Sequence, residues 1–280
     1  MVISDVLIAV LTWILAVQLL GLGNTVGYHR LLTHRAFVAH PVVRHGFTLL
    51  GAMHGGSPVM WVGLHRLHHA KSDNDEDPHS PIQGFWWAHS GWLIGQRSPW
   101  LAIPFALSGF GQQLKILWHD VRRVAGRNPP VWRELCPDLM QEPLMRWLDM
   151  PFVATGLFVA QLGLAWLIAG PTGILWLWTV HLFLTNSSWS VNSVCHWPRF
   201  GAQPWDTRDW SRDVRWLGFL TNGESFHNSH HRYPRSARHA LHGGQDLSWW
   251  VIKGLSRVGL ASELWLPKAF RPKDAPEPQS

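Results

Sequence analysis

The sequence predicts an all-α integral membrane protein. We expect about three to four transmembrane helices, several interfacial or re-entrant helices, and a cytoplasmic helical cap. Two observations predict this class: several long runs are apolar and uncharged, and all 24 Lys and Arg residues fall within residues 30–146 and 199–280. Cytoplasmic segments of membrane proteins carry the positive charge, so both ranges are expected on that side.

Three apolar runs have about the length that a helix needs to cross a bilayer. The predicted spans cover about residues 5–27, 152–169 and 173–191. The last two runs are joined by Gly170-Pro171-Thr172, which contains both strong turn-forming residues. So short a connection predicts an antiparallel helical hairpin.

The remaining segments are expected to stay on the cytoplasmic side, as residues 28–150 and 193–266 of a single domain over 1–266. Within them, residues 42–64 are moderately apolar but contain charged residues, glycines and a proline. This composition predicts a pair of short, partly inserted or re-entrant helices in place of a clean span. The tail, 267–280, is rich in proline and charge and is predicted to be disordered.

Composition narrows the partners and the compartment. The 20 tryptophans are typical of wide membrane–water interfaces, where the indole ring is favoured. The net charge is +6, but the basic residues do not gather into a nucleic-acid-binding motif, so no nucleic-acid partner is expected. Two cysteines, Cys136 and Cys195, exclude a disulfide framework.

Histidines are the candidate functional residues, because imidazole is the commonest protein ligand for metals. Two stretches place three of them at spacings of three and four, which share one face of a helix. These two sets are His65, His68 and His69, and His227, His230 and His231. A third pair, His29 and His34, is five residues apart, or about 140° on an ideal helix. This pair can reach one site only where the helix ends or bends between them.

Together with His196 at the end of the last span, these positions supply nine imidazoles, too many for one ion. The sequence therefore predicts two ions with four or five protein ligands each. The candidates are His29, His34, His65, His68, His69, His196, His227, His230 and His231. Asn192 is a candidate to hold a metal-bound water, and Glu224 a carboxylate that orients a ligand histidine.

Nitrogen ligation fits zinc, copper or iron, and two redox-capable ions beside hydrocarbon indicate dioxygen chemistry. The residues alone thus predict a membrane dimetal oxidoreductase. Hydrogen-bonding or interface roles are expected for His40, His45, His54, His89, His119, His181, His239 and His242. The acidic segment 72–79 is predicted to be a solvated loop that caps the next helix, with metal binding as the alternative.

The motifs HRLLTH (29–34), HRLHH (65–69), NSVCH (192–196) and GESFHNSHH (223–231) occur in this order around a hydrophobic hairpin. In this combination the chain resembles the membrane fatty-acyl desaturase family, most closely the bacterial type of the delta-9, stearoyl-CoA-desaturase-like branch. The resemblance implies two iron ions, dioxygen as co-substrate and two external electrons. The implied reaction introduces a cis double bond into a saturated acyl chain, at the delta-9 position, during unsaturated fatty acid biosynthesis.

The resemblance also implies the surroundings of the enzyme. We expect a multi-pass protein of the bacterial inner (plasma) membrane, in contact with membrane lipids and with its active site on the cytoplasmic side. Electrons are expected from a separate ferredoxin, rubredoxin or cytochrome b5-like donor with an NAD(P)H reductase, since the chain has no nucleotide motif. The acyl carrier stays open between coenzyme A, acyl carrier protein and a membrane lipid. Eukaryotic members carry a CoA-contacting Arg-Asp pair where this chain has Gly63-Leu64.

Three substrate contacts follow from the same resemblance. Trp61 and Trp189 each precede a histidine cluster and resemble tunnel-wall or headgroup residues, with interface anchoring as the alternative. Arg97 lies where family members carry a basic pair. Two other functions stay open from sequence: a di-iron membrane hydroxylase of the same superfamily, and a non-catalytic metal-binding membrane protein.

Overall fold

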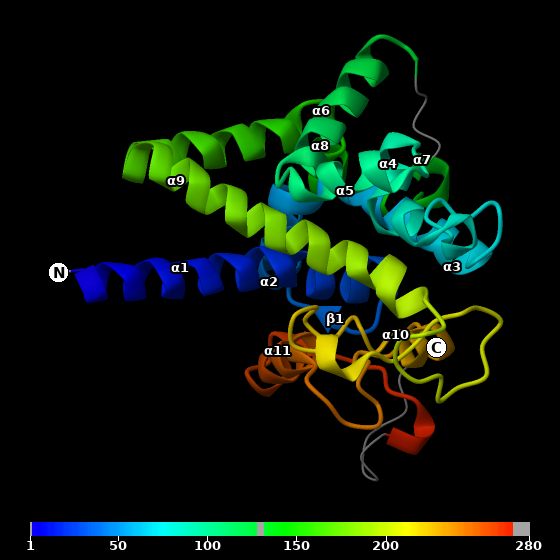
Figure 1. Cartoon of the computed structure of the whole chain (residues 1–280). Coiled ribbons are helices and arrows are strands. Elements are labelled where there is room, and N and C mark those ends of the chain that lie inside the picture. Colours follow the sequence, from blue (N-terminus) through cyan, green and yellow to red (C-terminus); the bar gives the residue numbers. More distant parts are fainter. Residues whose placement is uncertain (1, 128–131, 271–280) are drawn as a thin grey trace.

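The computed structural model describes residues 2–127 and 132–270. It is helical over most of this length, as predicted (Figure 1). The longer helices are α1 (Val2–Leu22), α2 (Pro41–Gly55), α3 (Pro58–Lys71), α5 (Pro99–Leu107), α6 (Gly111–Val124), α9 (Val153–Ser193) and α11 (Leu247–Arg257). The shorter ones are α4 (Trp92–Ile94), α7 (Trp132–Leu135), α8 (Pro143–Leu148) and α10 (His227–Arg232).

Other elements join these helices. Two π-helices are η1 (Gly23–Thr33) and η3 (Trp87–Gly91). The 3-10 turns are η2 (Pro81–Gln83), η4 (Leu139–Gln141), η5 (Val194–His196), η6 (Arg215–Leu217) and η7 (Lys268–Phe270). The strands β1 (Val38–Ala39) and β2 (Ala261–Ser262) pair antiparallel, with Val38 opposite Ser262.

Two helical stretches among the described residues are long and apolar enough to cross a membrane, Ser4–Thr33 and Val153–His196. The second stretch is not straight, because Ala169 and Gly170 leave the helical conformation (φ −145° and +56°). Figure 1 shows the two halves of α9 folded back on each other from this point. The halves approach closely at Gly173, where a Cβ atom would lie 2.0 Å from the Ala165 carbonyl oxygen. The predicted hairpin is therefore present, with its break slightly earlier than expected.

The outer surfaces of this hairpin and of α1 are apolar and exposed. Leu167 is 82% exposed and Ile168 75%. The inner surfaces pack together, with Val17 and Leu20 of α1 against Val180 of α9 in one buried cluster. An exposed apolar surface of this extent indicates contact with lipid.

The first span continues into η1, whose π-helical winding was not predicted from the sequence. A π-helix bonds residues five apart, and the amide of His34 accordingly donates to the carbonyl of His29 (3.1 Å). Residues at this spacing lie on one face of such a helix. The wider turn thus brings together two histidines that an ideal α-helix would separate.

The run 42–64 forms two short helices, α2 and α3, as predicted. They are separated at Gly56, whose φ of +81° suits glycine, and Ser57 caps α3 by accepting from the Met60 amide (3.2 Å). Ser57 also donates to the buried carboxylate of Asp149 (2.6 Å). The start of α3, and with it the position of its histidines, is thereby fixed.

The cap is less helical than predicted. Between η5 and α10 the chain is mostly irregular, with isolated bridges from Asp213 to Ala202 and to Phe226. Pro198 and Pro204 lack the amide donor that a continued helix needs. Of the tail predicted to be disordered, residues 268–270 form η7, and residues 271–280 lie outside the described part.

Candidate metal centre

Five of the predicted histidines converge from three elements. Their ligand nitrogens lie within 4.8 Å of one another, and we call this group the five-histidine cluster. It comprises His29 and His34 of η1 and its end, His65 and His69 of α3, and His230 of α10. The contacts run through Nε2 atoms, with His230 lying 3.0 Å from His29 and 2.8 Å from His69.

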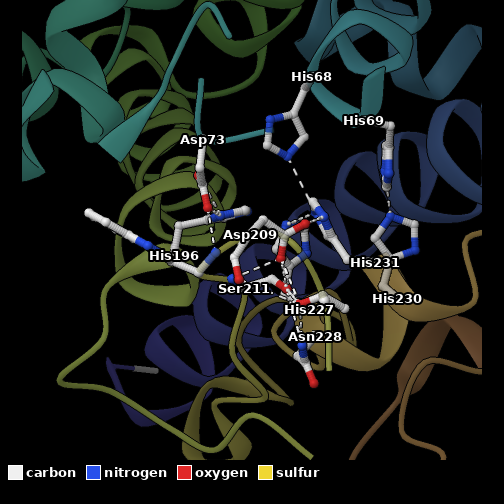
Figure 2. A network of polar contacts seen from close by, with 12 residues as sticks. His68, His69, Asp73, His196, Asp209, Ser211, His227, Asn228, His230 and His231 are labelled. Carbon is white, nitrogen blue, oxygen red and sulfur yellow. Dashed lines mark hydrogen bonds and ion pairs between the residues drawn. The ribbon is translucent and has the colours of Figure 1, made fainter. Parts of the chain in front are cut away.

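The other four histidines form a second group, the four-histidine cluster. It comprises His68 of α3, His196 of η5, and His227 and His231 of α10. Nε2 of His231 lies 3.3 Å from Nε2 of His68 and 3.0 Å from Nε2 of His227 (Figure 2). The clusters adjoin, since the rings of His69 and His231 stack with their centroids 4.6 Å apart. The structure therefore gathers all nine candidates, as groups of five and four.

Carboxylates lie behind the four-histidine cluster, on the side of the rings away from the other imidazoles. Nδ1 of His68 is 2.9 Å from Asp77, Nδ1 of His196 is 3.0 Å from Asp73, and Nδ1 of His231 is 2.6 Å from Asp209. Figure 2 shows the Asp73 and Asp209 contacts. A carboxylate in this position fixes the tautomer of the imidazole and leaves Nε2 as a free lone pair.

These acidic partners were missed, and the prediction of a solvated loop over 72–79 was wrong for three residues, Asp73, Asp77 and His79, which are buried. Asp73 and Asp77 are buried, while Asp75 and Glu76 are exposed. Burial is possible because each carboxylate is satisfied: Asp77 accepts from the Asp73 amide (3.0 Å) and Asp73 from the Trp210 amide (2.5 Å), besides their histidines. Asp77 follows His68 by nine residues, which is not a helical repeat, so the sequence did not indicate this contact.

Asp209 is itself held by its surroundings. Its carboxylate accepts from the hydroxyls of Thr207 (3.0 Å) and Ser211 and from the Ser211 amide (3.1 Å). Asn228, next to His227, donates to both hydroxyl oxygens, at 3.0 Å and 3.3 Å. This network ties the irregular loop of the cap to α10 (Figure 2).

Glu224 supplies the corresponding carboxylate to the five-histidine cluster by contacting Nδ1 of His29. The buried Arg30 guanidinium bridges Glu224 (3.1 Å) and Asp246 (2.9 Å). Burial alone would raise the pKa of Glu224, but His29, His239 and Arg30 hold that pKa well below its usual range. The carboxylate is therefore ionised at neutral pH.

His239 lies closer to this centre than its assignment as an ordinary hydrogen-bonding residue implied. It is fully buried, its ring centroid lies 4.5 Å from that of His230, and its Nδ1 is 3.4 Å from Glu224. Burial beside Arg30 lowers the pKa of His239 to about 4. His239 follows His231 by eight residues, so it does not share the spacing of three and four residues that identified the other histidines.

The donor set fits metal ions. Burial, and then the neighbouring imidazoles, hold the pKa values of His65, His69 and His230 well below the usual histidine range, so these rings are neutral. A neutral ring whose Nδ1–H points to a carboxylate presents only a lone pair at Nε2. Where two facing Nε2 atoms both carry lone pairs, a separation of about 3 Å is repulsive unless a cation lies between them. Nε2 of His196, buried without a hydrogen-bond partner among the described residues, is a further open donor.

Two cavities adjoin the clusters. The larger, about 340 Å³, is lined by Trp61, His65, Trp189 and Asn192 among others, a size typical of small-molecule sites. The smaller, about 80 Å³, reaches between α1 and α9 and shares Trp61, His65 and Asn192 with the larger one. Both predicted tryptophans and Asn192 thus border the space beside the histidines.

Arg97 does not border that space. It is absent from the lining of both cavities, as far as the described residues define them, and its side chain is exposed. It donates to Gln83 (2.9 Å) and lies over the ring of Trp87. The structure offers no support for a substrate contact at this position.

Comparison with known proteins connects this geometry to an activity. The model of the fatty acid desaturase family matches residues 7–252. An acyl-CoA 5-desaturase of Anemone leveillei is 36% identical over 249 residues, which cover 88% of this chain and 68% of the relative. The sn-1 stearoyl-lipid 9-desaturases of Synechocystis sp. and Anabaena variabilis are each 34% identical over 88% of this chain, covering 68% and 79% of the relatives.

The family match covers both histidine clusters, the hairpin of α9 and most of α1. These matches confirm the resemblance seen in the histidine motifs. The relatives named above are all called desaturases, of an acyl-CoA or of a stearoyl lipid, and none of them is called a hydroxylase. The chain belongs to the fatty acid desaturase family and is an oxygen-dependent desaturase.

Proposed function

We propose that the five-histidine and four-histidine clusters each bind one iron ion, and that the chain desaturates a saturated acyl chain beside them. The observation that carries this proposal is the convergence of nine Nε2 atoms into two adjoining groups. Structural zinc sites close at four ligands and have no redox chemistry, so a paired nitrogen site in a desaturase favours iron. Bound iron would supply the electron transfer to dioxygen that the reaction requires.

The overall reaction joins one acyl chain, dioxygen, two electrons and two protons to give one cis double bond and two water molecules. The chain's own residues position the participants. Asp73, Asp77, Asp209 and Glu224 orient four of the imidazoles through Nδ1. Burial of His68, His196 and His230 excludes bulk water from the centre.

The two cavities are proposed to hold the acyl chain. Since both share Trp61, His65 and Asn192, a chain that occupied both would pass directly beside the clusters. Holding an unactivated methylene at a fixed place is the main requirement for such a reaction. We propose that Asn192 holds a metal-bound water and that Trp61 and Trp189 contact the acyl chain, because all three line the cavities. The sn-1 stearoyl-lipid 9-desaturases among the relatives favour the delta-9 position.

We further propose three membrane spans, one from α1 with η1 and two from the halves of α9. The metal centre would then face the cytoplasm of a bacterial inner membrane, since the positively charged segments lie on its side. Electrons would come from a separate ferredoxin, rubredoxin or cytochrome b5-like donor and its NAD(P)H reductase.

The test is expression of the full chain in a bacterial host without its own desaturase. Fatty acids are then profiled by mass spectrometry with localisation of the double bond, and iron is measured in the purified protein. We expect a new cis monoene, at delta-9, and about two irons per chain. His230→Ala should abolish the monoene, whereas His45→Ala, which alters an exposed histidine outside both clusters, should not.

Hydroxylated chains without a monoene would contradict desaturation. A monoene that persists in the His230→Ala variant would contradict the ligand role of the five-histidine cluster. Purified protein that contains one zinc and no iron would contradict the metal assignment.

A further inference from the structure

The identity of the acyl carrier can be argued from α6, which forms one wall of the larger cavity. Gln112, Lys115, Ile116 and His119 of this helix line the cavity. Its opposite surface is apolar and exposed. Exposed there are Leu114, Leu117, Trp118, Val121 and Val124.

An exposed stripe of five large apolar residues on a helix of 14 residues is costly in water. An amphipathic helix with cations beside its apolar surface is typical of helices that lie in the membrane interface. Figure 1 shows α6 running across the direction of α1 and α9 at the end of the hairpin that meets the rest of the protein. In the proposed three-span arrangement, this wall of the cavity would lie at the level of the lipid headgroups.

Two cations mark the edge of α6 between its cavity side and its lipid side. Lys115 and Arg122 are seven residues apart, two turns along one face of the helix. Neither has a carboxylate partner among the residues that the structure describes, whereas Arg123 and Arg133 both pair with Asp149 (3.5 Å and 2.6 Å). Burial, and then the charge of Arg122, lowers the pKa of Lys115. The two cations therefore share one edge of α6, two turns apart, and no acidic side chain of the described residues pairs with either.

The cavities themselves carry little positive charge. Of the described residues that line either one, Lys115 is the only Lys or Arg. Counting the described cavity linings together with the edge of α6 that carries Lys115 and Arg122, only these two cations have no carboxylate partner, whereas a coenzyme A thioester brings three phosphate groups. One lipid phosphate, in contrast, needs one or two charge-assisted contacts. The small number of cations beside the cavity and the contact of α6 with the bilayer thus both favour a membrane lipid as the acyl carrier.

We propose that the acyl substrate is the chain of a bilayer glycerophospholipid, whose phosphate binds Lys115 and Arg122 while the chain enters the larger cavity past α6. This inference rests on the proposed desaturase function and specifies the carrier. A lipid that stays in its leaflet reaches the cavity without passing through water. The enzyme then needs no surface that binds a water-soluble acyl carrier.

The experiment uses membranes that contain the full-length enzyme, with host cytosol and NADPH as the source of electrons. One arm supplies phosphatidylglycerol labelled twice, with deuterated stearoyl chains and a carbon-13 glycerol backbone. Two other arms supply carbon-13 stearoyl groups as the thioester of coenzyme A or of acyl carrier protein. Intact products are measured by mass spectrometry at early times.

We expect a deuterated monoene in lipid molecules that keep the carbon-13 glycerol. A monoenoyl thioester that forms while the labelled lipid stays saturated would overturn the inference and leave desaturation intact. A deuterated monoene separated from its labelled glycerol would also overturn it, since the chain must then have been released first. No monoene in any arm would contradict the proposed function itself.

A variant tests the phosphate contact. Lys115→Gln should lower conversion of the labelled lipid about five-fold, the factor expected for losing one cation at a lipid surface. The matched control is Lys253→Gln, which removes an exposed lysine from the amphipathic α11. Iron content should be unchanged in both variants. Equal conversion by the two variants would exclude Lys115 as a phosphate contact.

Discussion

Oδ2 of Asp209 lies 2.6 Å from Nδ1 of His231, whose Nε2 faces the imidazoles of His68 and His227. Asp77 and Asp73 contact His68 and His196 in the same way. Three of the four histidines in this cluster are thus backed by a carboxylate from an irregular segment of the chain. The cap and the loop after α3 therefore contribute directly to the geometry of the metal centre.

Replacing Asp209 by Asn should weaken metal binding at the four-histidine cluster. The amide cannot act as an anionic acceptor for Nδ1–H of His231, and loss of such a partner typically lowers metal affinity 10–100-fold. The measurement is iron content after dialysis against a graded series of chelator concentrations. Asp206→Asn, an exposed change on the same loop, is the control. Equal iron retention by the two variants would exclude an orienting role for Asp209.

Glu224→Gln should reduce both iron binding and stability. The change leaves the buried Arg30 with Asp246 alone, and breaking a buried ion pair typically costs about 3–5 kcal/mol. Thermal unfolding of the iron-free protein in detergent measures this loss. Glu142→Gln breaks the more exposed pair with Arg44 and should cost less than about 1 kcal/mol. Similar losses of stability in the two variants would show that the buried network of Arg30, Glu224 and Asp246 contributes no more than an exposed ion pair.

Acid should destabilise the iron-free protein. The pKa values of His34, His65, His69, His227 and His231 are lowered in the fold, chiefly by burial. Unfolded histidines take up protons near their usual pKa of about 6.5, so below that pH the unfolded state binds more protons. The free energy of unfolding should therefore be highest above pH 6.5 and fall from there towards pH 5. A Tm series from pH 8 to 5 checks this, and a flat series would contradict it.

Trp189→Ala should alter the handling of the acyl chain. The indole of Trp189 lines the larger cavity and stacks on Phe105, with ring centroids 5.7 Å apart. Its removal enlarges the cavity and should cost about 3–5 kcal/mol of stability. Products from a mixture of saturated chains should shift in length or in bond position. Trp100→Ala, at a tryptophan that is 85% exposed, is the control and should leave the profile unchanged.

The three-span topology can be tested with single added cysteines. Cys136 and Cys195 are fully buried, so they should not react with a membrane-impermeant maleimide. Thr172→Cys, at the turn of α9, should react in intact spheroplasts, and Arg208→Cys, on the exposed cap, only in inverted vesicles. Labelling of both from the same side would contradict the hairpin as two membrane spans.

Periodicity and charge distribution predicted much of the fold. The spacing in His65–His69 and His227–His231 predicted two helical faces, and both are present in α3 and α10. Such signals are local, since a helix brings residues three and four apart together whatever the rest of the chain does. The apolar runs likewise predicted α1 and the hairpin of α9. That these histidines bind iron stays a prediction.

Contacts between distant segments could not be predicted in this way. Asp73 meets His196 across 123 positions, and Glu224 meets His29 from the opposite end of the domain. An acidic residue in a polar turn has the same local pattern whether the fold buries it or leaves it in water. For the same reason the cap was expected to be helical, and His239 was not placed beside Glu224.

The contact between η1 and α2 has a consequence for how this protein can vary. A Cβ atom on Gly23 would lie 2.3 Å from the amide of Gly51, and one on Gly27 would lie 2.9 Å from the carbonyl of Phe47. His29 and His34 are therefore placed by two backbones in direct contact, with no side chain between them to adjust. Substitution at either glycine, or a one-residue insertion in η1, would rotate both histidines away from α3. We expect this stretch to tolerate sequence change and redesign far less than the apolar surface of the same helix.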